Sequence, residues 1–324
     1  MLELLSITVD PAYARRLWAW PGNTVFVDLE ITDKERRQAA RDTVINHHEL
    51  DDAVRLAGIP DRGPLLVRVN AVAHGGAEEA AALVRNGVVR GSVVRSAGGP
   101  SGGGGPGSDR LMLPMFRTRS EVDAVVEAMR QAEKDASASA APDAAGPDAS
   151  ATGGAAPEPP RLTLLAETVA AVEGIEGILA GQPDWVDHVH LGLNDLSLER
   201  GTGFLFAPVA TGEVAELAAR VRGAGRRFGF GGVGMPETGG PVPAERILGE
   251  HVQVGSSCVI LSRAFHAALD PARPDDPDDP RSLAGGLARV RAWEARWRAA
   301  EAGELDTNHR ELVGAIEQVL RGAS

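Results

Sequence analysis

The chain contains eight short, largely apolar runs of strand length, and amphipathic helical patterns lie between most of them. The runs are LLSITV (4–9), TVFVDL (24–29), LLVRVN (65–70), RLMLPM (110–115), RLTLLA (161–166), DHVHLGL (187–193), RRFGFGG (226–232) and SCVILS (257–262). The helical patterns occupy 12–20, 77–87, 119–134, 167–181 and 213–225. Strands that alternate with helices pair in parallel. Eight such units predict an α/β fold, a (β/α)₈ TIM barrel.

Two segments interrupt this alternation, residues 96–108 (SAGGPSGGGGPGS) and about 135–160, which are rich in Ala, Ser, Asp, Gly and Pro. Neither can bury enough apolar area to offset its ordering entropy, so both are predicted to be flexible insertions. Each follows a helix and precedes a strand. Both should therefore lie on the N-terminal face of a barrel domain spanning residues 1–264, opposite the loops that build active sites.

An acidic, Pro-rich linker (265–282) and a C-terminal helical extension (283–324) are predicted after the barrel. Apolar residues at three- and four-residue spacing form one stripe along the extension: Leu283, Leu287, Val290, Trp293, Trp297, Leu312, Ile316 and Leu320. A stripe with two tryptophans needs a partner surface. We expect a homo-oligomer formed through these helices, with packing on the chain's own barrel as the alternative.

Composition excludes several classes of partner. A net charge of −12, 4% aromatic residues and a single Tyr argue against nucleic acid and anionic membranes. No apolar run approaches the length of a membrane span, and no targeting segment is evident. Cys258 is the only cysteine and lies in an apolar run, so an internal disulfide and a thiolate metal cluster are excluded. A cytoplasmic protein is expected.

Polar residues stand where several predicted strands end. They are Asp28 and Glu30, Arg68 and Asn70, Glu167, and Asp195. The carboxyl ends of barrel strands share one rim, so these side chains should meet there. Glu167 and Asp195 are suited to hold one hard cation with open positions for a 2-oxo acid, which is an enolate sink. Arg68 is suited to share the enolate charge.

Each of these signals has a structural alternative. Glu167 and Asp195 could be ordinary helix N-caps, and Arg68 could simply form an ion pair with Glu30. His188 and His190 share one side of a strand and suggest a metal pair, but a third ligand is missing and packing inside the barrel is favoured.

The segment GFGGVG (229–234) fits the letter of a dinucleotide motif without the rest of that unit. In a barrel the loop after the seventh strand often lines the substrate pocket, so Gly231 and Gly232 could let a substrate approach the backbone. Ser262, followed by Arg263, could add an anion contact after the eighth strand.

In order along the chain, VFVDLE, LLVRVN, LMLPMF, LLAET, HLGLNDLS and GSSCVILSR resemble the strand motifs of the HpcH/HpaI aldolase/citrate lyase family of the pyruvate/phosphoenolpyruvate barrel superfamily. The resemblance covers about residues 4–263 without the two insertions. It implies that Glu167 and Asp195 bind Mg²⁺ or Mn²⁺. It also implies that Arg68 contacts an oxo-acid substrate and stabilises its enolate, and we place Asn70 beside that substrate.

One position departs from the family pattern. Pyruvate aldolases of this family carry a histidine base after the glutamate of the second strand motif, and Ile31 stands there. The run DLE followed by Lys34 and Arg37 is more similar to the citrate-lyase β-subunit branch. His48 could transfer the proton instead, or act only as a helix-start residue, and Asp28 or Glu30 could orient a metal-bound water.

The residues and the resemblance together predict a magnesium-dependent carbon–carbon lyase acting through the enolate of a 2-oxo acid such as pyruvate or an oxaloacetate-like compound. A lyase acting on an acyl-CoA thioester is the alternative from the same fold. A barrel that serves as a non-catalytic binding or regulatory subunit is the alternative from another class.

Overall fold

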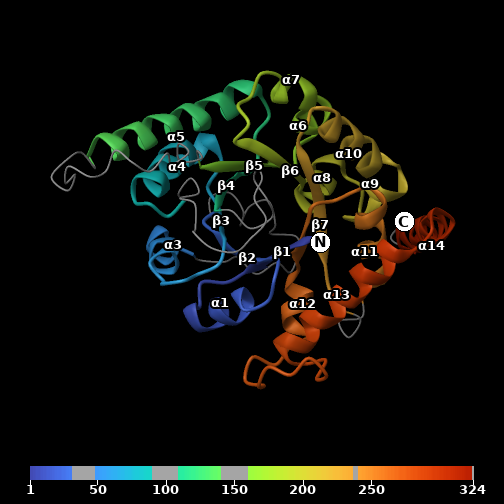
Figure 1. Ribbon diagram of the computed structural model, residues 1–324. Coiled ribbons are helices and arrows are strands. Elements are labelled where there is room, and N and C mark those ends of the chain that lie inside the picture. Colours follow the sequence, from blue (N-terminus) through green and yellow to red (C-terminus); the bar gives the residue numbers. More distant parts are fainter. Residues whose placement is uncertain (31–47, 90–108, 140–159, 236–239, 323–324) are drawn as a thin grey trace.

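A closed barrel of eight parallel strands, in chain order, forms the centre of the molecule (Figure 1). The computed structural model describes residues 1–30, 48–89, 109–139, 160–235 and 240–322. The strands are β1 Glu3–Ile7, β2 Asn23–Asp28, β3 Leu65–Arg68, β4 Arg110–Leu113, β5 Arg161–Ala166, β6 Val186–Leu191, β7 Arg227–Val233 and β8 Cys258–Leu261. The predicted (β/α)₈ barrel is confirmed.

Helices surround the barrel. They are α1 Pro11–Trp18, α3 Leu50–Ala57, η1 Val72–His74, α4 Gly76–Arg85, α5 Arg119–Ser139, α6 Val169–Glu173, α7 Ile175–Leu179, α8 Leu193–Arg200, α9 Ala207–Ala210, α10 Glu213–Gly223, α11 Ala244–Gln253, α12 Arg263–Ala267, α13 Leu283–Ala299 and α14 Ala302–Gly322. Within the described part of the chain, no helix combines the length and apolar character needed to cross a membrane.

Two helix boundaries differ from the predicted ones. The pattern at 167–181 is two short helices, α6 and α7, which meet at Gly174, a residue with poor helix propensity. Helix α5 continues to Ser139, so it includes the first residues of the segment predicted to be flexible from about 135. The rest of that segment up to 159, and the whole of 96–108, lie outside the described residues.

The inside of the barrel is apolar at its middle and charged at its lower end. Leu5, Phe26, Leu66, Met112, Leu165 and Cys258 form the buried middle layer. Below it, Glu3 pairs with Arg110 at 2.7 Å and accepts a hydrogen bond from Thr24. Burial works to raise the pKa of Glu3, but the Arg110 guanidinium outweighs it and the pKa is lowered. The N-terminal end is therefore closed by an ionised pair.

The apolar stripe of the C-terminal extension packs on the chain's own barrel. Helices α13 and α14 contact α11 in Figure 1. The stripe residues Leu283, Leu287, Val290, Trp297, Leu312 and Ile316 are buried there, and Trp293 and Leu320 pack against the same core. Packing on the chain's own barrel, the alternative considered for this stripe, is therefore what the structure shows, and a homo-oligomer stays a prediction.

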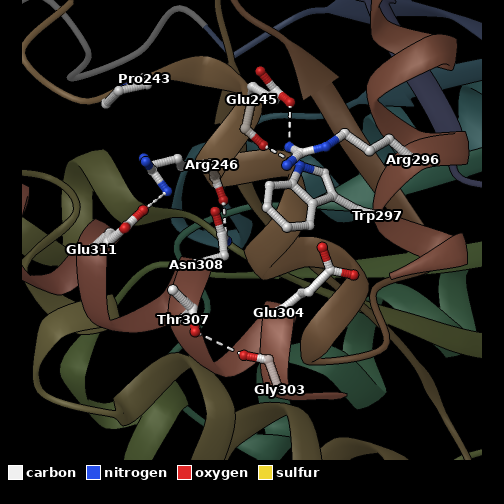
Figure 2. Close-up of a pocket in the computed structure, with 10 residues that line it drawn as sticks. All are labelled: Pro243, Glu245, Arg246, Arg296, Trp297, Gly303, Glu304, Thr307, Asn308 and Glu311. Atoms are coloured by element: carbon white, nitrogen blue, oxygen red, sulfur yellow. Dashed lines mark hydrogen bonds and ion pairs between the residues drawn. The ribbon is translucent and has the colours of Figure 1, made fainter. Parts of the chain in front are cut away.

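Polar contacts fix the extension in place at a surface cavity of about 620 Å³ (Figure 2). Trp297 donates its indole N–H to the backbone oxygen of Glu245 at 2.8 Å, and Arg296 lies over the Trp297 ring while pairing with Glu245. Arg246 forms an ion pair with Glu311. These contacts join α11 to both C-terminal helices.

The segment predicted as a linker (265–282) is held against the barrel by its acidic residues. Asp275 binds Arg16 of α1 through two hydrogen bonds of 2.8 and 2.9 Å. Asp279 pairs with Arg273 at 2.6 Å, and Ser282 caps α13 by accepting from Gly285 N–H. No helix or strand lies between α12 and α13, and these contacts anchor the segment.

Gly249 sets how closely α11 approaches α13 and α14. A Cβ there would lie 2.5 Å from Asn308 Nδ2 and 2.9 Å from Trp297 Cε2. We expect Gly249→Ala to lower the free energy of unfolding by about 1–3 kcal/mol, since overpacking strains a close contact. Gly314 of α14 is the matched control because its Cβ would meet no atom within 4 Å. Gly314→Ala should be stabilising by about 0.5–1 kcal/mol in the same urea titration.

Candidate active site

The candidate site is built from residues at the carboxyl ends of four strands. Asp28 ends β2 and Arg68 ends β3, and the two are register partners, so both side chains point inward side by side. Glu167 directly follows β5. Asp195 was expected where a strand ends, but α8 begins at Leu193 and Asp195 lies in the first turn of that helix. The predicted convergence on one rim is therefore found for the strand-end residues, with Asp195 supplied by a helix.

Arg68 is held by two carboxylates. Its Nε and Nη2 atoms donate to the two oxygens of Asp28 at 2.8 and 2.7 Å, and Nη1 lies 3.3 Å from Glu30 Oε2. Burial alone would lower the pKa of Arg68, but Asp28 and Glu30 outweigh it and raise the pKa well above its usual range. The ion pair considered between Arg68 and Glu30 thus exists, and Asp28 is the closer, bidentate partner.

Glu167 is fixed by backbone geometry on both sides. Its Oε1 accepts a 3.2 Å hydrogen bond from the N–H of Met115, which has a left-handed φ of 56°. A Cβ on Gly192 would lie 2.7 Å from Glu167 Cβ and 2.8 Å from Oε2. Gly192 is the N-cap of α8, so the absence of a side chain there lets Glu167 lie against the start of the helix that carries Asp195.

The rim contains side chains of the kind that bind a hard cation. Four buried carboxylates gather there, Asp28 (1% exposed), Glu30 (2%), Glu167 (3%) and Asp195 (9%). The Arg68 guanidinium pairs with two of them, Asp28 and Glu30. No group of three or more His, Cys, Asp or Glu side chains arranged for a metal occurs in the described ranges. Glu167 and Asp195 would thus be two protein ligands, which is common for Mg²⁺ because water and substrate supply the others.

His48 lies beside Asp28, as required of a rim residue, but its hydrogen bond argues against a base. The backbone N–H of Asp28 donates to His48 Nδ1 at 3.0 Å. With Nδ1 as the acceptor, the neutral ring carries its proton on Nε2. Such an imidazole offers a hydrogen-bond donor at Nε2, so a general-base role for His48 would need a different tautomer. Ile31, where the family pattern has its histidine, lies outside the described residues.

Asn70 is buried at the rim and is oriented by α4. Its backbone N–H and its Nδ2 donate to the two oxygens of Glu79 at 2.8 and 2.7 Å. Glu79 therefore determines which way the Asn70 amide points. Contact of Asn70 with a substrate stays a prediction.

The remaining predicted substrate contacts have structural reasons for their residue types. Gly231 has a φ of 45°, and a Cβ on it would lie 2.7 Å from Leu193 Cδ1. Gly232 lies against backbone oxygen of β8, and Ser262 caps α12 by accepting from Phe265 N–H. Packing and capping thus explain all three, and their contact with a substrate stays a prediction.

His188 and His190 pack around Cys258 inside the barrel. Cys258 Sγ lies 3.4 Å from His188 Nε2 and from His190 Nδ1, and His190 Nε2 lies 3.1 Å from Gly231 O. Burial lowers the pKa of His190 to about 4 and that of His188 well below 6.5, and it raises the pKa of Cys258 to about 12. The three groups are neutral at pH 7, which agrees with the packing interpretation.

Three residues at or near the site were not predicted from the sequence or were given only a minor role there. Glu79 lies in a helical pattern and gave no sign of reaching Asn70. The contact between Met115 N–H and Glu167 could not be expected either, because a methionine rarely adopts a left-handed φ. Arg263 follows the eighth strand. Burial lowers its pKa, and the nearby charges of Asp28 and Arg68 act on it in opposite directions. Its guanidinium therefore lies near the same rim.

The buried histidines predict acid-sensitive stability. In the folded chain the pKa values of His190 and His266 are about 4, and those of His188 and His251 are also lowered. Between pH 6.5 and 4 the unfolded chain therefore binds more protons, so the free energy of unfolding falls as pH falls. The slope is at most about 1.4 kcal/mol per pH unit for each histidine. Urea titrations between pH 7.5 and 5 measure it.

His251 offers a matched pair of variants for this test. It stacks on Phe230 with ring centroids 3.9 Å apart, and neither ring nitrogen has a hydrogen-bond partner among the described residues. His251→Phe should keep the stacking and reduce the slope by about one proton. His74 is exposed, and His74→Gln should leave the slope unchanged. An unchanged slope in His251→Phe would contradict the assignment.

The fold and the site define a class, a parallel (β/α)₈ barrel whose rim gathers acidic residues around a fixed arginine. No protein-family model matches the chain, and no curated protein matches its sequence. Solved structures do resemble it. A citrate lyase from Burkholderia xenovorans LB400 superposes with a TM-score of 0.54 at 13% identity, covering 98% of this chain and 83% of that one.

Two further solved structures also resemble the chain. An HpcH/HpaI aldolase/citrate lyase family protein from Burkholderia cenocepacia J2315 gives a TM-score of 0.50 at 14% identity, covering 81% of this chain and 88% of that one. A citrate lyase β subunit from M. tuberculosis, complexed with oxaloacetate and magnesium, gives 0.46 at 16% identity over 82% and 93%. The first two likenesses establish the fold, and the third is too low to carry an argument. The family suggested by the strand motifs is also the family of these neighbours.

Proposed function

We propose that this protein is a divalent-metal-dependent carbon–carbon lyase that acts through the enolate of a 2-oxo acid such as pyruvate or an oxaloacetate-like compound. The observation that carries the proposal is the bidentate Asp28–Arg68 pair at the same rim as buried Glu167 and Asp195. A preorganised guanidinium beside two carboxylate ligands is the donor set that enolate chemistry needs. The likeness to a citrate lyase supports the fold, and the proposed reaction is inferred from these residues.

In this proposal Glu167 and Asp195 hold Mg²⁺ or Mn²⁺. The bound ion would polarise the substrate carbonyl as a Lewis acid. Met115 N–H and Gly192 keep the Glu167 carboxylate in place, so the ligand is oriented before any substrate arrives. This preorganisation reduces the reorganisation that binding would otherwise require.

Arg68 stabilises the negative charge that develops on the substrate oxygen. Asp28 and Glu30 act as positioning residues, because both are engaged with the Arg68 guanidinium. His48 is assigned to hydrogen-bond donation through Nε2, since its Nδ1 accepts the Asp28 N–H. Asn70, oriented by Glu79, is placed to contact the substrate.

Exchange of the methyl protons of pyruvate for deuterium tests enolate formation without any second substrate. With Mg²⁺ or Mn²⁺ in D₂O, we expect ¹H NMR to show catalysed loss of the pyruvate methyl signal. Glu167→Gln and Asp195→Asn should each reduce the exchange rate by about 10²-fold or more, because each removes an anionic ligand. Removal of metal with EDTA should abolish catalysed exchange.

Glu173→Gln is the matched control, since Glu173 is an exposed carboxylate on the helix that follows Glu167. It should exchange at the wild-type rate. Catalysed exchange that persists in EDTA, or that survives Glu167→Gln, would refute the metal-enolate assignment. Water-proton relaxation measures Mn²⁺ binding as a second readout. The affinity for Mn²⁺ should be lower in Glu167→Gln and in Asp195→Asn.

Arg68→Lys separates charge from geometry. Lysine keeps the positive charge but cannot make the bidentate contact with Asp28. We expect the exchange rate to fall by about 10²–10³-fold, which is typical for loss of an oriented donor to an oxyanion. Mn²⁺ affinity should stay near the wild-type value. An unaltered exchange rate would show that Arg68 serves the fold alone.

A further inference from the structure

The cavity of about 620 Å³ beside the C-terminal extension has the size of a small-molecule site (Figure 2). Ordinary ligand pockets measure about 300–1,000 Å³. Its walls come from the start of α11, the end of α13 and the first half of α14. These helices lie outside the barrel, so the cavity is separate from the rim that carries the proposed reaction (Figure 1).

Asn308 is a buried polar residue on the apolar stripe of α14. It precedes Leu312 and Ile316 at four-residue spacing, and it is 1% exposed. Its Nδ2 donates to the backbone oxygen of Arg246 at 3.0 Å. Gly249 leaves room for this group, since a Cβ there would lie 2.5 Å from Nδ2. The amide nitrogen is therefore held against α11, and Oδ1 of the same amide is turned the other way.

Asn308 Oδ1 has no hydrogen-bond partner within the described ranges. A buried amide oxygen normally accepts an N–H or O–H, because leaving it unpaired forfeits the hydrogen bond it made to water. The contact with α11 explains Nδ2 and leaves Oδ1 unexplained. Since the side chain lines the cavity, a ligand there can supply the donor.

The charges around the cavity leave one carboxylate unbalanced. Arg296 pairs with Glu245 at 2.6 Å, and Arg246 pairs with Glu311. Glu304 is exposed, accepts one backbone hydrogen bond at 3.2 Å, and forms no ion pair with any part of the chain that the structure describes. Three glutamates and two arginines line the cavity, so one negative charge remains at Glu304.

Glu304 and Asn308 can contact one ligand group together. They are four residues apart on α14, so they share one face of that helix. Figure 2 shows Glu304 below the Trp297 ring and Asn308 beside it. An ammonium group carries one positive charge and three N–H donors and has no acceptor. An anion would instead face two acceptors, and a neutral donor would leave the Glu304 charge unbalanced.

We propose that this cavity binds a small organic monocation through a primary ammonium group, which donates to Asn308 Oδ1 and to the Glu304 carboxylate. The carbon chain of the ligand lies in the remainder of the cavity. This site is independent of the proposed lyase reaction, because its walls are formed by α11, α13 and α14. The bound ammonium would connect α14 to α11 through the amide of Asn308.

Butylammonium is the probe, with butan-1-ol and butyrate as neutral and anionic analogues of similar length. Saturation-transfer NMR on the full chain at pH 7 should show saturable binding of butylammonium. Butan-1-ol should bind about 10-fold more weakly, because charge-assisted hydrogen bonds are the stronger ones. Butyrate should not bind. Added NaCl should weaken butylammonium binding, since salt screens an exposed carboxylate.

Glu304→Gln removes the unbalanced charge with little change of shape. The affinity for butylammonium should fall by about 10-fold, while that for butan-1-ol stays near the wild-type value. Asn308→Ala removes the buried acceptor and should also weaken butylammonium binding. Glu317→Gln is the matched control, because Glu317 is an exposed carboxylate of the same helix, pairs with Arg321 and does not line the cavity. It should bind butylammonium normally.

Glu304→Gln carries the test by itself if Asn308→Ala fails to fold. Absence of saturable butylammonium binding to the wild type would mean that water alone fills the cavity, and the proposal would be overturned. Equal binding of butyrate, or wild-type affinity in Glu304→Gln, would overturn it as well. Deuterium exchange into pyruvate should be unchanged in Glu304→Gln, so failure of the lyase assignment leaves the ammonium site standing.

Discussion

The buried ion pair between Arg68 and Asp28 is the interaction on which the arrangement of the rim depends. Both residues are inward-facing register partners, and a slip of one residue between β2 and β3 would turn one of them out of the barrel. Removing one partner of such a pair typically costs about 3–5 kcal/mol, because the other charge is left buried. The pair therefore couples correct strand pairing to a correctly aimed guanidinium.

The barrel separates this pair from its other buried charges by an apolar layer. Phe26 lies between them, with its ring 5.7 Å from the Arg68 guanidinium carbon, in the same layer as Leu5 and Met112. Below, the Glu3–Arg110 pair closes the N-terminal end. An apolar layer of low dielectric lets each ionised cluster be balanced by its own partners. The charge of Arg68 at the rim is thus balanced by its neighbours Asp28 and Glu30, while the Glu3–Arg110 pair closes the other end of the barrel.

Strand positions and rim residues could be predicted from sequence because their signals are local. Each apolar run matches a strand within about two residues, and Glu167 follows β5 where the pattern placed it. What failed depends on tertiary contacts. Asp195 lies in a helix turn because α8 begins directly after β6, and the stripe around Trp297 is covered by α11 of the same chain. Periodicity shows that a face is apolar and cannot show what covers it.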